Sequence, residues 1–415
     1  MKVLNLSLFI CLLFSICSCG EEDVLTSQDI NNQPLSITND STFFRTEAEA
    51  VFSAINTLSE MYPNDNRVSQ RPNSLKIKNV NHIKNSYSTS TNSPGFYIIN
   101  FDGGGFAMIS NDTRATEVYA YSNEGNLNLG SNNNVDYYLS LANDYLNYEI
   151  ANSNRASFIP ITPAPSDPEN PEHYALVLHG DHYCHKMPIN EVITGSFEYL
   201  LKTEWSQGIP YNNLCLTSTG ARVEAGCVAI ALGQIMAYHK KPLSYNGHTY
   251  PWDLITQYPI IMPSWSVAQS VAELIHDISV SAGIDYWNGS SSANINGARN
   301  ALSDFGYNHV MSNYSYNIII NNIDSGRPCY TRGDNNNTFG HAWVIDGYRS
   351  ISTTYKYYTQ TTLELCYIGI ETLNYVHCNW GWGGSSNGFF LEKAFSNIDG
   401  NDFSKNLKII HDIYQ

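Results

Sequence analysis

Residues 226–242, GCVAIALGQIMAYHKKP, are apolar on nearly every side. A run without a polar stripe predicts a buried helix, and its length of roughly four turns suits a helix better than a strand. Lysines in the last turn favour the negative helix end, and Pro242 stops the helix. Gln234 is the polar exception inside the run, and we expect a hydrogen bond in the helix interior for it.

The rest of the chain alternates between helical and strand patterns. Helical spacing predicts helices over 47–61, 135–150, 267–282, 294–305 and 318–323. Short apolar runs predict strands over 96–101, 105–110, 118–122, 328–332, 341–348, 355–360, 363–370, 375–379 and 388–391. Residues 65–94 show little periodicity and are interpreted as loop. Helices followed by a strand-rich second half predict an α+β fold.

A proline-rich stretch divides the chain. Five prolines lie between residues 160 and 171, which is typical of a semi-extended linker. We therefore expect a small α+β domain over 20–159, a linker and processing region over 160–194, and a second domain over 195–415. A new N-terminus between about 180 and 200 is the expected product of processing, because domain boundaries lie in exposed linkers.

The first residues form an export signal. Lys2 precedes an apolar run over 4–16 that is too short to span a bilayer. The sequence ICSCG resembles the lipobox of bacterial lipoproteins, which makes 1–19 the signal and Cys19 the lipidated residue; an ordinary cleaved signal is the alternative. Acidic residues directly afterwards favour export to the outer membrane or cell surface. Acyl chains anchor a protein without spanning the membrane.

Charge and cysteine count exclude some classes of protein. The 415 residues carry a net charge of −16, which argues against non-specific nucleic-acid binding. Nine cysteines, of which three lie in the signal, do not suggest a disulfide scaffold. A bond between Cys366 and Cys378 across a hairpin near 371–372 is the one pairing considered. The histidines and cysteine of DHYCH at 181–185 lack a partner cluster, so no metal site is predicted.

Cys227 is the candidate nucleophile. It stands near the start of the predicted buried helix, where free N–H groups and the helix dipole stabilise a thiolate; the alternative is a core cysteine. Such a nucleophile needs a base. His341 begins an apolar strand after an Asn-rich loop and is the favoured base; the alternative is a strand-end histidine without a role. His377 is a rival base, because the alternation of side chains along a strand places it on the same face as Asn379.

Further residues complete the predicted site. The Asn379 amide is placed to hold the imidazole, and Trp380 to cover that bond from water. The Gln207 side chain, with the backbone N–H groups of Cys227 and Val228, is the candidate oxyanion hole.

The order Gln, Cys, His, Asn-Trp-Gly resembles the papain clan of cysteine peptidases, and especially the streptopain family. The similar stretches are TEWSQGIPYNNLC, GCVAIALGQIMAYHKKP, DISVSAGIDY, FGHAWVIDGY and HCNWGWGGSSNGFF, and FYIINFDGGGFAMISND resembles the family's inhibitory propeptide. The resemblance implies a two-lobed papain-like domain and a zymogen that cleaves proteins with broad specificity and no cofactor. It implies that Cys227 is the nucleophile, His341 the base, Asn379 and Trp380 the orienting pair, and Gln207 the oxyanion residue.

Some features lie outside the resemblance or leave alternatives open. Gly226, Gly340 and Trp382 are expected to border the substrate cleft. Residues 350–360 predict an extra hairpin that alters the substrate rim. Protein substrates and the chain's own prodomain are the expected partners. A catalytically silent adhesin or inhibitor, or a thiol acyltransferase on the same scaffold, are the alternative functions.

Overall fold

The computed structural model describes residues 43–65, 67, 75–84, 93–128, 133–153, 184–289, 291–334, 340–359, 365–398, 401–402 and 406–415. Within it, Asp40–Gln415 form one compact unit. None of the helices in the described ranges combines the length and the apolar character needed to cross a membrane. The predicted signal and lipidation site at Cys19 lie outside the described residues.

The N-terminal part packs helix α1 (Glu47–Met61) and helix α3 (Asn133–Ser153) with four antiparallel strands. The strands are β1 (Ile77–Lys84), β2 (Gly95–Phe101), β3 (Phe106–Ser110) and β4 (Val118–Ser122). The loop prediction over 65–94 is wrong for β1. This strand lies at the sheet edge with mostly exposed or half-buried side chains, so it lacks the apolar alternation that reveals a strand.

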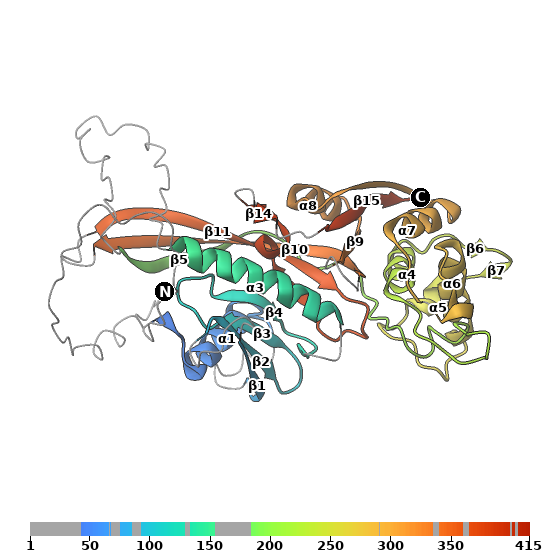
Figure 1. Cartoon of the computed structure of the whole chain (residues 1–415), viewed down its shortest axis with the longest axis horizontal. Helices are drawn as coiled ribbons and strands as arrows, with labels where there is room; N and C mark the ends of the chain where they lie inside the picture. Colours follow the sequence, from blue (N-terminus) through green and yellow to red (C-terminus); the bar gives the residue numbers. More distant parts are fainter. Residues whose placement is uncertain are drawn as a thin grey trace, which may run out of the picture. The chain divides into compact units, whose positions relative to one another are not determined.

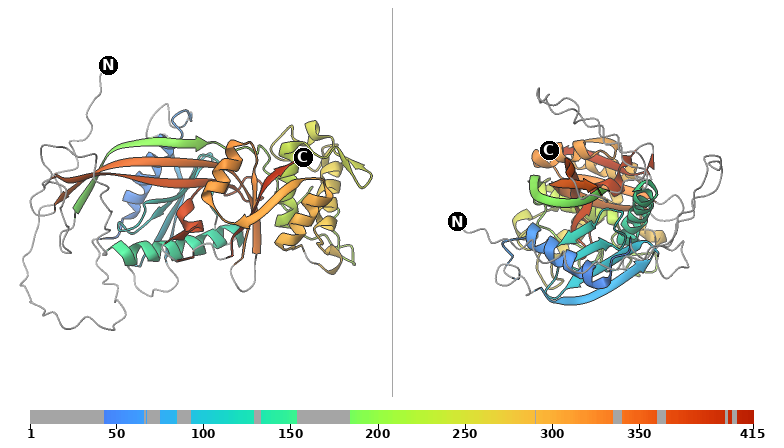
Figure 2. Two further views of the ribbon diagram at one scale, coloured as in Figure 1. Left: turned by 90° about the horizontal axis from the view of Figure 1, so that it is seen from above. Right: turned by 90° about the vertical axis from the view of Figure 1, so that its left-hand side faces the viewer.

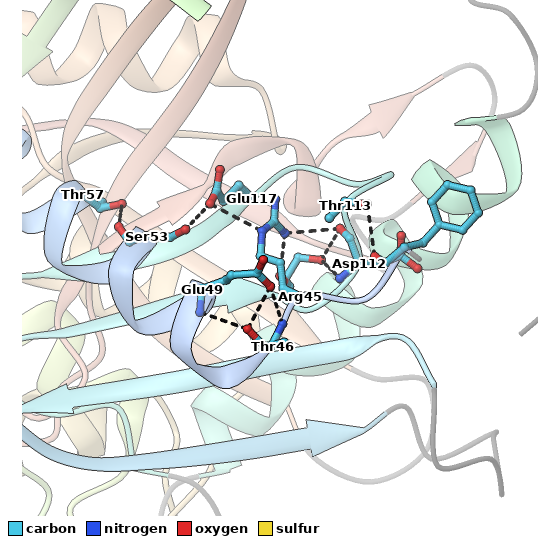
Figure 3. A network of polar contacts seen from close by, with 10 residues as sticks. Arg45, Thr46, Glu49, Ser53, Thr57, Asp112, Thr113 and Glu117 are labelled. Atoms are coloured by element: carbon cyan, nitrogen blue, oxygen red, sulfur yellow. Dashed lines mark hydrogen bonds and ion pairs between the residues drawn. The ribbon is translucent and has the colours of Figure 1, made fainter. Parts of the chain in front are cut away.

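Helix α1 begins where its sequence predicts. The Thr46 hydroxyl accepts the N–H of Glu49 at 3.3 Å, and the Glu49 carboxylate accepts the N–H of Thr46 at 2.7 Å. This capping box satisfies two free donors of the first turn. Arg45 donates to the Ser110 carbonyl at 2.8 Å and so ties the start of the helix to the end of β3 (Figure 3).

Most helices of the second part group together (Figure 1). They are α4 (Cys227–His239), α5 (Trp252–Ile255), α6 (Ala268–Ser281), η3 (Tyr286–Asn288) and α7 (Ile295–Asp304), while α8 (Tyr316–Asp324) lies apart and packs against strands of the sheet. Residues 228–237 of α4 are all buried, as the apolar run predicts. The helix ends before the predicted Pro242, because Lys240 adopts a left-handed conformation with φ 54°.

One 11-stranded sheet extends through both parts of the chain, in the order β1-β2-β3-β4-β12-β11-β10-β9-β15-β8, with β5 paired to β10. The strands of the second part are β5 (Cys184–Phe197), β8 (Asn308–Asn313), β9 (Cys329–Asp334), β10 (Gly340–Thr359), β11 (Leu365–Asn379), β12 (Gly388–Leu391) and β15 (Lys408–Tyr414). Short elements complete the fold: β6 (Ser244–Tyr245), β7 (His248–Thr249), η4 (Glu392–Phe395), β13 (Asn397–Ile398) and β14 (Asn401–Asp402).

The two parts meet in that sheet. Tyr121 of β4 lies opposite Phe389 of β12, and Ala120 lies opposite Phe390. The α+β class is therefore confirmed, with an N-terminal unit that shares its sheet with the second part. The boundaries at 159 and 195 stay a prediction, since the two parts form one unit.

The segment before residue 200 differs from the predicted linker. Residues 184–197 form β5, which pairs with β10 from Tyr348↔Phe197 to Thr359↔Cys184. The premise that the whole of 180–200 is an exposed linker is wrong, because this part is a hydrogen-bonded strand. Residues 190–197 of this strand are exposed or half-buried, so the sequence lacks the apolar alternation that reveals a strand. Residues 154–183, which hold the proline-rich stretch, lie outside the described residues.

The predicted extra hairpin is present, but it has a different turn and position. Strand β11 is continuous from Leu365 to Asn379, so the turn does not fall at 371–372. Cys366 and Cys378 therefore lie along one strand, about 40 Å apart at 3.3 Å per residue, and cannot form the considered bond. Cys378 is a free thiol.

The hairpin also lies far from the candidate base. Ser350 is nine positions along β10 from His341, about 30 Å of extended chain. Strands β5, β10 and β11 run together away from the helices α4 to α7, toward the opposite end of the sheet (Figures 1 and 2). The expectation that this hairpin alters the substrate rim is therefore wrong.

Two apolar cores lie on opposite faces of β10. Trp343 and Ile345 belong to a cluster with α1, α3 and the N-terminal strands. Ala342 and Val344 belong to a cluster with α4, α6 and α7. Because neighbouring side chains point to opposite faces of a strand, β10 carries both cores at once.

Candidate active site

Cys227 is the first residue of α4. Gly226 precedes it with φ 88° and offers no side-chain cap. A Cβ on Gly226 would lie 2.0 Å from the Ser291 carbonyl oxygen. Glycine is needed here because the backbone adopts a positive φ and because the Ser291 carbonyl packs directly against it. The segment that packs closely against Gly226 is therefore Ser291 of the same chain, whereas the sequence predicts that Gly226 borders the substrate cleft.

The thiol of Cys227 is partly buried and free. Burial raises its pKa. Hydrogen bonding from the Ala342 N–H, the charge of Arg332, and the N–H groups of Val228 and Cys227 itself act in the opposite direction. The donors that would stabilise a thiolate are therefore in place, but desolvation outweighs them in this arrangement.

His341, the second residue of β10, is buried. Its ring stacks against Trp343 at 5.9 Å between centroids and lies 6.2 Å from Trp380. Burial lowers the pKa of His341 to about 3, and the Trp380 carbonyl opposes this shift only in part. Its Nε2 has no hydrogen-bond partner in the described part of the chain. The imidazole is consequently neutral.

Cys227 and His341 come from adjacent segments but are not engaged with each other. No hydrogen bond joins the described thiol and imidazole groups. His341 lies on the face of β10 that carries Trp343, whereas the thiol meets the N–H of Ala342. On the His341 side, α3 supplies Tyr137, whose hydroxyl lies 2.1 Å from where a Cβ on Gly333 would be. Gly333 is the β9 residue opposite His341.

Asn379 has a different set of contacts from the predicted one. Its Nδ2 donates to the Thr203 carbonyl at 2.8 Å and to Gln234 Oε1 at 3.3 Å. Its Oδ1 accepts from Gln234 Nε2 at 3.1 Å and from the N–H of Gly381 at 3.2 Å. The amide is fully occupied, so the predicted Asn379–imidazole bond is absent here, and the imidazole meets the Trp380 carbonyl.

The same contacts explain Gln234. It is fully buried on α4, and its Oε1 also accepts the N–H of Trp205 at 3.1 Å. The partners lie on other elements, so the expected bond within the helix interior is wrong. A buried glutamine in an otherwise apolar helix was the signal that it had a polar partner from elsewhere.

The predicted oxyanion and cleft residues lie around α4 and the strand ends. Gln207 is buried, and its carbonyl accepts the N–H of Ala225 at 2.9 Å, which places it beside the residues before Cys227. Trp380 is fully buried and Trp382 is half-buried. Gly340 is exposed and lies against the Arg332 guanidinium.

His377 is engaged elsewhere. Its Nδ1 lies 2.6 Å from Asp346 Oδ1, and its ring stacks on Tyr199 at 4.6 Å. Asp346 is fully buried and accepts the N–H of Leu201 at 3.0 Å. Sequence reasoning missed Asp346, although a carboxylate inside the apolar run WVIDG indicates a buried partner. His377 is thereby tied to the segment that enters the second part.

No group of three or more His, Cys, Asp or Glu side chains within the described ranges is suited to hold a metal ion. The side chains of Cys184 and His185 lie outside the described set.

Comparisons with known proteins agree with this division of the chain. Residues 205–390 match the family model described as the peptidase C10 family, and residues 46–150 match that of the Spi protease inhibitor. Streptopain of Streptococcus pyogenes is 26% identical over 392 residues, covering 86% of this chain and 87% of streptopain. The thiol protease/hemagglutinin PrtT of Porphyromonas gingivalis is 26% identical over 217 residues, covering 45% of this chain and 22% of PrtT.

A solved structure shows the same fold. A fragment of Prevotella intermedia prointerpain A aligns with a TM-score of 0.53 at 19% identity, covering 81% of this chain and 99% of the fragment. The predicted papain-like architecture, preceded by a prodomain-like unit, is confirmed at the level of the fold.

Proposed function

Through residues 205–390 the chain belongs to the peptidase C10 family of cysteine peptidases, and from that premise we propose that it is an exported endopeptidase made as a zymogen. Cys227 is the nucleophile and His341 the general base. The observation that carries this assignment is the placement of a free thiol at the start of a buried helix, beside the strand that carries His341.

In the active form, the Cys227 thiolate attacks a peptide carbonyl carbon and forms a thioester bond. The Gln207 amide and the N–H groups of Cys227 and Val228 hold the oxyanion. The His341 imidazolium gives its proton to the leaving amine as the C–N bond breaks. Neutral His341 then takes a proton from water, which hydrolyses the thioester and restores the thiol.

The present arrangement supports a latent form of that enzyme. A neutral, buried His341 and a thiol with a raised pKa cannot form a thiolate–imidazolium pair. The inhibitor-like segment 46–150 supports this interpretation, since it supplies β4 beside β12 and α3 beside Gly333. Release of this segment exposes His341 to water, which raises its pKa toward the ordinary value.

Substrates, location and processing follow as further parts of the proposal. Proteins are the substrates, and the prodomain is an intramolecular inhibitor. The lipobox-like ICSCG at the N-terminus supports lipidation of Cys19 and a position at the outer membrane or cell surface, from which processing releases the enzyme. N-terminal sequencing of the mature form tests this, and a first residue upstream of 184 would leave β5 in the enzyme.

Substitution of the nucleophile tests the assignment. Cys227→Ala is expected to lower casein hydrolysis at least about a thousandfold and to stop self-processing, because no other group forms the thioester. Cys329→Ala, which removes a buried thiol from β9, is the matched control and retains activity. An active Cys227→Ala enzyme would exclude the proposal.

A second pair of variants tests the base. His341→Ala is expected to be as inactive as Cys227→Ala, while His377→Ala keeps measurable turnover because its partner is Asp346. A larger loss of activity in His377→Ala than in His341→Ala would assign the role of the base to His377. An acyltransferase would instead transfer the acyl group to a labelled amine, and a silent adhesin would cleave nothing.

A further inference from the structure

Arg332 is a cation beside the nucleophile that the mechanism above does not use. It lies on β9 opposite Ala342 of β10. Tyr330, two residues earlier, and Ala342 both belong to the apolar cluster of the helical half. The alternation of side chains along a strand therefore places Arg332 on the face of the sheet that carries α4. Its charge lowers the pKa of both Cys227 and His341, which places it close to the two groups.

The guanidinium is fixed by the backbone around it. Its Nη1 donates to the Ala293 carbonyl at 2.6 Å. A Cβ on Gly340 would lie 2.4 Å from its Nη2, so the group packs directly on the strand before His341. Ala293 belongs to the same loop as Ser291, which covers Gly226. Arg332 is thus held between the loop over the nucleophile and the strand of the base.

Among the side chains that the structure describes, no carboxylate pairs with Arg332. Buried Arg349 differs, since it meets Glu198 at 2.8 Å. A guanidinium has five N–H donors in a planar fork that matches a carboxylate, and the Ala293 carbonyl takes up only part of it. A fixed, half-buried cation with no counter-ion among the described side chains is suited to bind an anion from outside the chain.

We propose that Arg332 forms a carboxylate-binding subsite, which selects peptides with an acidic residue next to the scissile bond. The proposal rests on the peptidase function proposed above. A carbonyl that reaches the thiol brings the neighbouring residues within one or two steps of 3.8 Å, so their side chains pass the wall formed by β9 and β10. In a chain of net charge −16, acidic peptides are otherwise repelled, and a local cation reverses this at one position.

Alkylation of Cys227 tests the subsite without turnover. Iodoacetate and iodoacetamide both form a bond from the thiolate sulfur to carbon as iodide leaves, but only iodoacetate brings a carboxylate. The rate of each is measured by mass spectrometry of the Cys227 peptide from the full chain. Arg332→Gln is expected to lower the iodoacetate-to-iodoacetamide rate ratio about tenfold, the size expected for unit charges several ångströms apart.

Matched variants separate local from general charge effects. Arg332→Lys keeps the cation and is expected to retain most of the ratio. Arg222→Gln removes the same charge from an exposed turn and is expected to change the ratio less than twofold. An unchanged ratio in Arg332→Gln, or an equal fall in Arg222→Gln, would overturn the proposal.

Peptides then locate the acidic residue. A parent peptide with Gln at two positions on each side of the cleaved bond is compared with single Gln→Glu versions, each with a free or an amidated C-terminus. The wild type is expected to cleave one internal Glu peptide about tenfold better than its Gln parent, and Arg332→Gln to lose this preference. A preference that follows the free C-terminus assigns the subsite to the terminal carboxylate.

The two proposals fail in different ways. Equal cleavage of all these peptides by the wild type would exclude the subsite while the peptidase function remained. No cleavage of any peptide would exclude the peptidase function, and the alkylation ratio would then decide whether Arg332 binds a carboxylate beside Cys227.

Discussion

At the scale of single residues, Gln234 and Asn379 form a reciprocal pair of side-chain amides that joins helix α4, which begins at Cys227, to β11. Both are buried, and the two bonds measure 3.1 and 3.3 Å. Gln234 also holds the N–H of Trp205, two residues before Gln207. The pair therefore fixes the positions of α4, β11 and the segment 205–207 relative to one another. The papain-like motif predicted Asn379 as a site residue, but motif spacing alone does not reveal which neighbour its amide meets.

This pairing predicts strong coupling between the two residues. Gln234→Leu leaves the buried N–H of Trp205 without its partner and removes one hydrogen bond from each polar atom of the Asn379 amide, which costs about 2–4 kcal/mol of unfolding free energy. Asn379→Ala costs a similar amount, and the double variant is expected to fall short of the sum by about 1–2 kcal/mol. Thermal unfolding measures all three, with the exposed Gln269→Leu of α6 as control. Strict additivity would contradict the pair.

At the scale of elements, Arg349 joins the inhibitor-like segment to the second part. It is 1% exposed, and its guanidinium lies 5.1 Å from the Tyr62 ring, 5.7 Å from Tyr121 and 4.4 Å from Phe389. Tyr62 follows α1 and Tyr121 lies on β4, while Phe389 lies on β12. Cation–π contacts of this kind contribute most when desolvated. The contact lies beside the β4–β12 pairing and strengthens the same junction.

Truncation of this arginine is expected to loosen the junction. Arg349→Ala removes the contacts with three rings and leaves a cavity, at a cost of about 3 kcal/mol. In the Cys227→Ala background, which prevents self-cleavage, Tm should fall by roughly 4 °C. Arg327→Ala is the matched control, because Arg327 also meets a carboxylate and a ring but is 35% exposed. Equal decreases in Tm for both variants would show that burial of the arginine at the junction adds nothing to the stability of the folded chain.

At the scale of the whole molecule, the sequence predicted the elements that have strong periodicity and missed those that depend on partners. The bounds of α1 agree with its prediction because its cap and its apolar face are both local signals. Strands β1, β5, β8 and β15 were missed because their side chains are mixed and their pairing comes from distant segments. The shared sheet and the buried state of His341 also arise only when both parts of the chain are together.

That burial makes the stability of the whole molecule depend on pH. The pKa of His341 is lowered to about 3, against about 6.5 in an unfolded chain. Below pH about 6.5 the unfolded chain binds a proton that the folded chain excludes, so the free energy of unfolding falls as pH falls toward 3, by about 2 kcal/mol at pH about 5. His239, with a pKa of about 4, acts in the same direction, while Glu204 and Glu392, with raised pKa values, oppose it.

The contribution of His341 can be isolated by difference. In the Cys227→Ala background, lowering the pH from about 7 to about 5 should reduce Tm by roughly 2–3 °C more than in the variant that also carries His341→Gln, because glutamine cannot take up the proton. His309→Gln, at a half-buried position of β8, is the control and should keep the full decrease. If His341→Gln left the decrease unchanged, the imidazole would not be held neutral in the latent form, and acid would favour release of the inhibitor-like segment through other groups.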